Sequence, residues 1–552
     1  MGRRTIPVRP AIFVIAVLLG ANISNGEAVT PVYSVAFTNS NSSLISSETI
    51  FGVNSEMEFT NVNLPPCNTK ITTDCISKFE YQIADGAWKK AAFLRNLPVR
   101  TKWSGNGGSF YFDEGKVIPE NSKMNIPASS SGTVWELPGA NHAEGDQYLL
   151  NFHIFGNLVN CSQSGSGADL KITCTNDSTT DFKSGRSNLT IIPLGNLRTG
   201  DASSMPKDFS SSFEVYDGNT CTTFPDQGWF CATRAAFPAN LNFRVSAILE
   251  KTKPILNGQN WLIGRVANPK IVITPSQNNA TTVIFEAKPV SLYNASGTLP
   301  SGDEGLKAMF DAENNVWMEL YNEPMSPGYD AYRNKFLANP GNFTVGGGGA
   351  DSASWVRWNG LAKYIDERSS RDFSIWKFHT VTPSGESYAW LSRCTGKTGI
   401  SGLSASNATV MFPAPPTWNQ NDQSLNLRIA APHLDAEGKV ISGFYGVVMP
   451  VETASCLWGK DNTKAKVEIS VIDKDGVRDI QTSSLKTRSG FVYFDASNFH
   501  YSAPELKIRV IGVSKSVKAR VPAKKIKCVK GKLVKYVTVI PAKCPTGYKK
   551  VN

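Results

Sequence analysis

The residues Phe79–Ala84 (FEYQIA) alternate large apolar and polar side chains and lead into Asp85-Gly86, followed by Ala87-Trp88. Alternation with a period of two predicts a half-buried β-strand, and an Asp-Gly pair between two such segments predicts a hairpin turn. This segment decides the fold class because its pattern is repeated along most of the chain. Similar alternation occurs at Leu149–Ile154, Phe243–Ile248, Ile271–Ile273, Val467–Ile472 and Leu506–Val510.

Turn residues recur between these strands every 8 to 12 residues, a spacing that is typical of β-sandwiches. We therefore predict a mainly β protein built from tandem β-sandwich (Ig-like) domains, with one or two short helices. The clearest helical pattern, with apolar residues spaced as one face of a helix, consists of Trp355, Trp358, Leu361, Ala362 and Ile365. A weaker helical pattern covers 302–314, and four glycines at 346–349 predict a flexible connector.

One segment of the chain has an internal echo. Leu241–Ala247 (LNFRVSA) recurs as Leu425–Ala431 (LNLRIAA), 184 residues further on. An aromatic–glycine strand follows each copy, at 261–264 and at 444–447. Two interpretations stay open: amphipathic strands that resemble each other by chance, or two related β-modules.

The N-terminus has the features of an export signal. A basic start with Arg3 and Arg4 precedes the apolar stretch 11–21, and Gly26 and Ala28 are small residues suited to a cleavage site. This apolar stretch is too short to cross about 30 Å of hydrocarbon as a helix. The expected organisation is a signal peptide (1–28), an N-terminal β domain (29–200), a second β domain (201–300), a helix-containing connecting region (301–370), a C-terminal β-sandwich (371–513) and a basic cassette (514–552).

The ten cysteines predict disulfides, because an exported chain meets an oxidising environment and the number is even. They are Cys67, Cys75, Cys161, Cys174, Cys221, Cys231, Cys394, Cys456, Cys528 and Cys544. Four of the five pairs that follow one another in sequence are 8 to 16 residues apart, which suits the neck of a hairpin or loop, although other pairings stay open. No Cys-x-x-Cys spacing occurs, so we expect neither a zinc site nor any other metal or cofactor.

The tripeptide Asn322-Glu323-Pro324 is the one catalytic candidate. It resembles the strand-end Asn-Glu-Pro of retaining (β/α)₈ glycosidases, in which the Glu is the acid/base. That chemistry needs a second carboxyl about 5 Å away, on a barrel of strand–helix repeats. The residues upstream of Glu323 lack such helices, and nothing marks a distant partner such as Glu386. We interpret the tripeptide as a coincidence and keep the glycosidase as the alternative function.

Other short motifs are weaker. Thr395–Thr398 (TGKT) resembles half a P-loop but has Leu391 where the first glycine belongs, and Asp473–Gly476 (DKDG) predicts a hairpin turn rather than a calcium loop. The five histidines show no metal-binding spacing. Tryptophans able to stack on a glycan ligand, although core positions are the more common use, include Trp103, Trp135, Trp229, Trp390, Trp418 and Trp458.

The C-terminus concentrates the positive charge. Leu506–Asn552 contains 14 Lys and Arg residues and no Asp or Glu, whereas the whole chain carries +11 and the leader +2, which leaves −5 for residues 29–505. Such a segment favours an anionic cell-wall polymer or lipid surface, and export argues against nucleic acid as the partner. Cys528 and Cys544 would close a small hairpin, and a plain solubilising tail is the other interpretation. The candidate contacts are Lys524, Lys525, Lys527, Lys530, Lys532, Lys535, Lys543, Lys549 and Lys550.

The cassette 525–532 (KIKCVKGK) with 543–550 (KCPTGYKK) resembles a C-terminal cassette of uncharacterised secreted actinobacterial proteins. The segments 455–459 (SCLWG) and 489–494 (SGFVYF) resemble the same proteins, and the similarity covers most of residues 230–552. The resemblance implies a bacterial exported surface protein and no particular activity. We therefore predict an exported cell-envelope protein that acts by binding or as a structural component.

Overall fold

The computed structural model describes most of the chain between residues 59 and 511 and part of the C-terminal cassette. The described ranges, several of them with short gaps, are 35–37, 45–47, 59–96, 99–100, 112–113, 117–164, 171–200, 219–298, 342–345, 355–381, 385–394, 399–511, 526–530, 533–537 and 549–551. Strands make up most of these residues, which confirms the mainly β prediction. The α-helices bounded within the described ranges are α4 (Gly385–Cys394) and α5 (Val451–Trp458).

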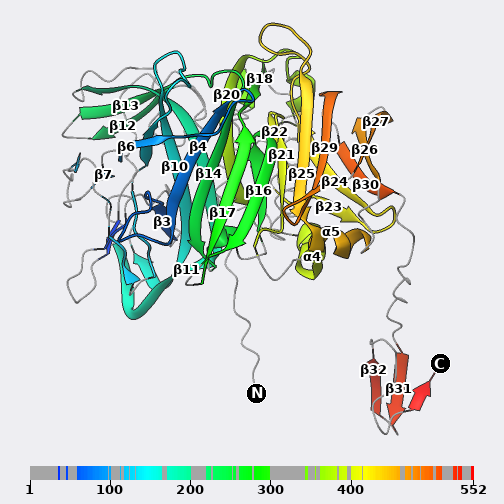
Figure 1. The fold of residues 1–552 in the computed structure, drawn as a ribbon. Helices are drawn as coiled ribbons and strands as arrows, with labels where there is room; N and C mark the ends of the chain where they lie inside the picture. The colour runs from blue at the N-terminus through cyan, green and yellow to red at the C-terminus, as the bar shows by residue number, and fades with distance from the viewer. Residues whose placement is uncertain are drawn as a thin grey trace.

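Three sheets form successive layers (Figure 1). The first, which we call the front sheet, has the order β16-β17-β14-β4-β5. Its strands are β4 (Cys75–Ile83), β5 (Lys89–Lys90), β14 (Leu241–Glu250), β16 (Ala267–Pro275) and β17 (Ala280–Lys288). The predicted hairpin is present here, because β4 pairs with β5 on either side of Asp85-Gly86.

The second layer, the central sheet, has 15 described strands, with the main path β28-β29-β25-β21-β15-β20-β11-β10-β9-β6. The strands of this path are β6 (Ala92–Asn96), β9 (Thr133–Glu136), β10 (Gln147–Ser164), β11 (Lys171–Gly200), β15 (Trp261–Arg265), β20 (Arg371–Val381), β21 (Gly402–Ser406), β25 (Ser442–Pro450), β28 (Lys486–Arg488) and β29 (Phe491–His500). The strands that branch from this path are β3 (Phe59–Asn63), β12 (Asn219–Phe224), β13 (Gly228–Arg234), β18 (Val290–Thr298) and β19 (Asn342–Val345).

The third layer, the back sheet, has the order β22-β24-β30-β26-β27, and β23 also pairs with β24. Its strands are β22 (Val410–Met411), β23 (Thr417–Asn419), β24 (Ser424–Ala430), β26 (Lys466–Asp473), β27 (Gly476–Ser484) and β30 (Glu505–Ile511). Asp473 pairs with Gly476 across the tip of the β26–β27 hairpin, which confirms the turn predicted for the DKDG motif.

The central sheet is covered on both faces. Leu262 of β15 packs in a core shared with the front sheet, whereas its neighbours Trp261 and Ile263 pack in a second core shared with the back sheet. Every residue of β15 and of β21 is therefore buried. A strand buried on both faces carries no alternating pattern, which is why WLIGR and GLSAS do not resemble the strands recognised by alternation.

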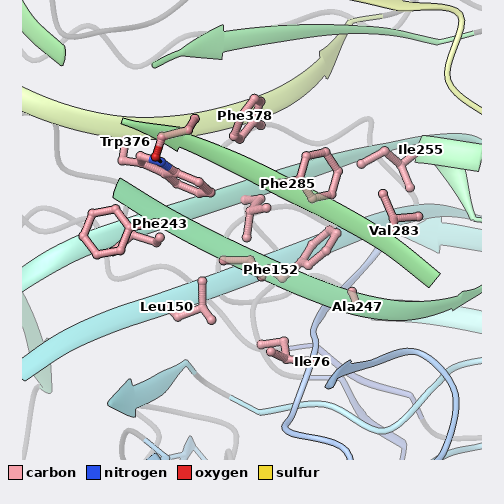
Figure 2. Packing of buried hydrophobic residues seen from close by; sticks show 14 of the residues in the cluster. Ile76, Leu150, Phe152, Phe243, Ala247, Ile255, Val283, Phe285, Trp376 and Phe378 are labelled. Carbon is pink, nitrogen blue, oxygen red and sulfur yellow. Dashed lines mark hydrogen bonds between the residues drawn. The ribbon is translucent and has the colours of Figure 1, made fainter. Parts of the chain in front are cut away.

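The core between the front and central sheets is rich in aromatic residues (Figure 2). Phe243 of β14 and Phe285 of β17 face Trp376 and Phe378 of β20, with ring centroids 6.1 Å apart for Phe243–Trp376 and 5.2 Å apart for Phe285–Phe378. The indole nitrogen of Trp376 donates a hydrogen bond to the carbonyl of Ala287, at 2.9 Å. A single hydrogen bond thus satisfies the polar atom of a fully buried side chain.

Strand pairing crosses the boundaries between the expected regions. Phe243 of β14 pairs with Tyr81 of β4, and Ile191 of β11 pairs with Trp376 of β20. Residues 29–200, 201–300 and 371–513 therefore contribute strands to common sheets, because each inner strand needs a backbone partner on both edges. Local sequence pattern identifies a strand but not the distant strand that completes its pairing.

The two copies of the internal echo occupy corresponding places. The first copy lies in β14 of the front sheet and the second in β24 of the back sheet, and each is followed by a strand of the central sheet, β15 or β25. Both copies thus run from an outer layer to the shared middle layer. This correspondence favours the interpretation as two related β-modules.

The predicted helical face is shorter than expected. Trp355, Trp358 and Leu361 are buried at positions with helical backbone, but Ala362 is exposed. A 3₁₀ turn at Ala362–Tyr364 follows, and Ile365 is already extended, with φ −76° and ψ 128°. The prediction was wrong for the last two positions because the chain leaves the helix there to continue as extended backbone. The patterns at 302–314 and 346–349 lie outside the described residues.

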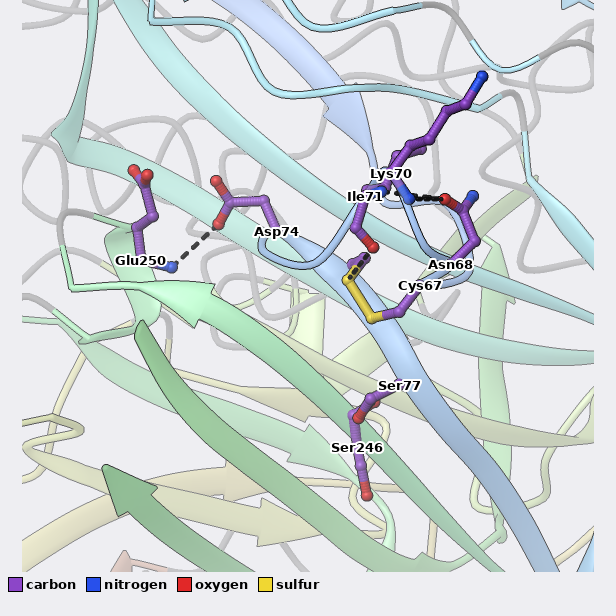
Figure 3. The surroundings of a disulfide bond; sticks show 9 residues. Cys67, Asn68, Lys70, Ile71, Asp74, Ser77, Ser246 and Glu250 are labelled. Atoms are coloured by element: carbon purple, nitrogen blue, oxygen red, sulfur yellow. Dashed lines mark hydrogen bonds between the residues drawn. A yellow bond between two sulfur atoms is a disulfide. The ribbon is translucent and has the colours of Figure 1, made fainter. Parts of the chain in front are cut away.

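Two disulfides are present in the described part of the chain. Cys67–Cys75 closes the loop that enters β4 (Figure 3), where Asn68 Oδ1 accepts hydrogen bonds from the backbone of Lys70 and Ile71. The second, between Cys394 and Cys456, joins α4 to α5. Among the other predicted pairs, the backbone register sets Cys161 opposite Cys174 and Cys221 opposite Cys231, and these bonds stay predictions. Cys544 lies outside the described residues.

The two disulfides should differ in their contribution to stability. In the chain-entropy model, removing Cys394–Cys456 with a double Cys→Ala change lowers the free energy of unfolding by about 4 kcal/mol, because the bond closes a separation of 62 residues. Removing Cys67–Cys75, with a separation of 8 residues, should cost about 2.5 kcal/mol. Urea unfolding under non-reducing conditions measures both. An equal loss for the two double variants would contradict the loop-length argument.

Candidate functional sites

The C-terminal cassette forms a small sheet of its own. Its strands β31 (Ile526–Lys530), β32 (Leu533–Val537) and β33 (Lys549–Val551) have the order β32-β31-β33, with no described pairing to the three layers. Figure 1 shows it apart from the layered body. The sequence predicted a small hairpin closed by Cys528 and Cys544. The described hairpin pairs β31 with β32 and sets Cys528 opposite Lys535, and β33 was missed because three residues are too few to show a pattern.

The described strands of the cassette contain five of the nine candidate lysines: Lys527, Lys530, Lys535, Lys549 and Lys550. Lys549 is exposed. The register sets Lys535 and Lys550 on either side of Cys528, so the basic positions come from all three strands. The other four candidates, Lys524, Lys525, Lys532 and Lys543, lie outside the described residues, as does the alternative catalytic residue Glu323.

A second charged feature crosses the front sheet. Successive strand registers align five charged residues of alternating sign in one row, Lys90, Glu80, Arg244, Glu286 and Lys270. Arg244 lies 2.7 Å from Glu286 and 3.7 Å from Glu80, and Lys270 also pairs with Glu286. The sequence contains these residues but not their alignment, because each pair comes from a different strand pairing. We call this row the ion-pair ladder.

The ladder also includes an aromatic contact. The guanidinium of Arg244 lies 3.8 Å from the centre of the Trp88 ring. Burial acts to raise the pKa of Glu286, but hydrogen bonds from Lys270 and Arg244 outweigh it, so the pKa lies below its ordinary value. Opposite charges directly across a sheet stabilise the pairing of the strands. The ladder is therefore a device that holds the front sheet together.

A buried ion pair fixes the loop between the Cys67–Cys75 disulfide and the end of β14. The ammonium of Lys253 lies 3.1 Å from the Asp74 carboxylate and 4.3 Å from the centre of the Phe182 ring. Asp74 also accepts a hydrogen bond from the backbone of Glu250, visible in Figure 3. Burial raises the pKa of Asp74, although Lys253 opposes it. Lys253 also lies 3.5 Å from the more exposed Glu250 carboxylate, so removing Lys253, rather than Asp74, would leave the greater uncompensated charge in the buried loop.

Most of the tryptophans proposed as sugar platforms lie in the core. Trp135, Trp390 and Trp458 are buried, and Trp418 is half-buried and packs edge-on against Trp458 at 5.5 Å. The indole nitrogens of Trp390 and Trp458 donate to backbone carbonyls, at 2.8 Å and 2.9 Å. Trp390, Trp418 and Trp458 pack in the core beside α4 and α5, whereas Trp135 packs in the core between the front and central sheets. Trp103 lies outside the described residues, and the side chain of Trp229 is not among those described.

A cavity of about 20 Å³ lies between the central and back sheets. Ser404 and Tyr445 of the central sheet and Arg428 of the back sheet are among the residues that line it. Burial raises the pKa of Tyr445 above its ordinary value. A cavity of this volume has room for one water molecule and is too small for a sugar ring.

Three carboxylates meet beside the loop at 435–439. Oxygens of Asp372, Asp435 and Glu437 lie within 4.8 Å of one another. Asp372 accepts a hydrogen bond from the backbone N–H of Ala436 at 3.1 Å, and Asp435 accepts one from the backbone N–H of Lys439 at 2.7 Å. Two of the three carboxylates, those of Asp372 and Asp435, therefore have a structural role, because they hold the loop backbone in place.

The central sheet also contains a histidine. His379 of β20 is half-buried, and desolvation of its imidazole, together with the positive charges of Lys377, Arg265 and Arg186, lowers its pKa well below the ordinary value. Desolvation and nearby positive charge both disfavour the protonated imidazole.

Comparison with known proteins does not assign a function to the chain. No protein-family model matches the chain, and no curated protein shows significant similarity to it. Among the described residues, no helix is long and apolar enough to cross a membrane.

The ion-pair ladder should make stability depend on pH. Because the folded-state pKa of Glu286 is below its ordinary value of 4.5, its contribution is present above pH 4.5 and is lost as pH falls through the folded-state pKa. We expect Glu286→Gln to lower the free energy of unfolding at pH 7 by about 1.5–3 kcal/mol, the range for hydrogen bonds to charged groups. The difference from the wild type should shrink as the pH falls below 4.5.

Urea unfolding at a series of pH values measures this effect, with the exposed Glu120→Gln as the matched control. A difference between wild type and Glu286→Gln that does not change between pH 7 and strongly acidic pH would contradict the role assigned to the ladder.

Proposed function

We propose that the protein is exported and acts in the cell envelope, by binding or as a structural surface component. In this proposal the cassette at 514–552 attaches the protein to an anionic envelope polymer or lipid surface. The layered body is then exposed on the outside of the cell. The observation that carries the proposal is the separation of charge between the two parts.

The separation is large. Residues 514–552 have 12 basic residues and no acidic residue, whereas residues 29–513, which include Lys507 and Arg509 of β30, carry a net charge of −3. A body with negative charge is repelled by an anionic surface, so attraction has to come from the cassette. Each Lys or Arg close to an anionic membrane contributes about 1 kcal/mol. A dozen such residues suffice for attachment without a binding pocket.

The disulfides support an extracytoplasmic location. Cys67–Cys75 and Cys394–Cys456 are bonded, and structural disulfides persist in oxidising compartments. The N-terminal segment 1–28, with a basic start and a short apolar stretch, agrees with export.

The alternative function, a retaining glycosidase that uses Glu323, receives less support. In the described residues before 301, the elements are strands in antiparallel and mixed layers with one 3₁₀ turn at Pro254–Leu256. The Asn-Glu-Pro of the glycosidases stands at the end of a strand in a parallel barrel with helices between the strands. We therefore prefer binding or structure over catalysis.

Truncation tests the attachment. Ending the chain after Val513 removes 12 of the 14 basic residues and keeps β30, which is an inner strand of the back sheet and ends at Ile511. We expect the truncated protein to stay folded and to leave the cell surface for the medium. The intact protein should be released by raised salt, because exposed charges are screened within about 10 Å at 0.1 M ionic strength.

Two controls make the test specific. One variant changes Lys527, Lys530, Lys535, Lys549 and Lys550 to Gln. The other changes the same number of exposed lysines in the body to Gln: Lys70, Lys78, Lys89, Lys251 and Lys439. Only the first should lose attachment to purified envelopes. Equal retention of intact and truncated protein at low and high salt would show that the cassette is a soluble tail.

A further inference from the structure

The arrangement of lysines in the cassette bears on which anionic partner it fits. Residues alternate between the two faces of a strand, and residues paired across strands share a face. The register pairs Cys528 with Lys535 and Lys550, so these two lysines share a face with Lys530, two positions along β31. Lys527 and Val529 occupy the opposite face, and Lys549, which pairs with Val529, shares it.

Basic residues therefore occupy both faces of the small sheet. One face has Lys530, Lys535 and Lys550, and the other has Lys527 and Lys549. The consecutive residues Lys549 and Lys550 fall on opposite faces of the same edge strand. This distribution differs from that of a sheet with one basic and one apolar face.

A planar surface can meet only part of this set. A membrane against one face of the sheet has the sheet itself between it and the register positions of the other group of lysines. A membrane against the β33 edge meets Lys549 and Lys550 but not Lys535, which lies about 10 Å away, two strand spacings across the sheet. No single plane is close to all five.

A flexible linear polyanion has no such restriction, because the chain can pass around an edge and contact both faces. We propose that the cassette binds a linear polyanionic polymer of the envelope, with phosphate or carboxylate groups along a flexible backbone, rather than the plane of a lipid bilayer. This inference rests on the proposed function, in which the cassette is the attachment site, and it selects the class of partner.

The experiment uses the full-length protein with two probes: long-chain polyphosphate, and vesicles of phosphatidylglycerol and phosphatidylcholine in equal parts. Three double Lys→Gln variants each remove two charges. They are a one-face pair (Lys535 and Lys550), an opposite-face pair (Lys527 and Lys549) and an edge pair (Lys549 and Lys550). The body variant with Lys70→Gln and Lys251→Gln is the matched control.

For a flexible polymer, all three doubles should weaken polyphosphate binding equally. The slope of log K against log salt should become shallower by about 1.4, because each phosphate contact on a single-stranded polyanion contributes about 0.7. The body control should leave the slope unchanged. Lys→Arg changes at the one-face pair should keep binding, which separates loss of charge from loss of folding.

Unequal effects of the three doubles, with one pair abolishing vesicle binding and another leaving it intact, would overturn the polymer proposal and identify a planar surface. That result would leave the cassette as the attachment site. If the intact protein binds polyphosphate and vesicles no more strongly than the protein truncated after Val513 does, the proposed function itself fails.

Discussion

The burial of both faces of the central sheet is the constraint on which the rest of the structure depends. A strand in this layer has to satisfy its backbone on both edges and accommodate a core on both sides, so each polar side chain within it needs a partner. Arg265 is completely buried and donates to the carbonyl of Ala408 at 2.7 Å, and Trp261 donates to Ser404 at 3.0 Å. Such hydrogen bonds offset the cost of removing polar groups from water.

The outer layers are stabilised by different means, because each has only one buried face. The front sheet has aromatic packing on its inner face and the ion-pair ladder on the other. At the edge of the back core, the helices α4 and α5 place Trp390 and Trp458 over the apolar residues, and the Cys394–Cys456 disulfide joins the two helices. The Cys67–Cys75 disulfide and the Asp74–Lys253 pair secure the opposite, N-terminal part.

The cassette cannot be stabilised in the same way as the layered body. A sheet of three short strands buries too little apolar surface to be stable by its core alone, and small extracellular units of this kind commonly depend on a cross-link. The predicted Cys528–Cys544 bond would serve that purpose. The body, with its extensive cores, and the small basic unit, with little core, are therefore stabilised by different means.

The sequence by itself determined the features that depend on neighbouring residues. Alternation identified β4, β14 and β30, the DKDG motif identified the β26–β27 turn, and the composition of residues 506–552 identified the basic cassette. Only the tertiary structure decided which strands pair. Alternation disappears in β15 and β21 because both faces are buried, and α4 and α5 are too short to show a helical period clearly. The ion-pair ladder joins Lys90 to Lys270 across four strand pairings, and the distribution of cassette lysines over two faces depends on the register with β33. These arrangements are set by contacts between residues far apart in the chain, and local pattern carries no record of them.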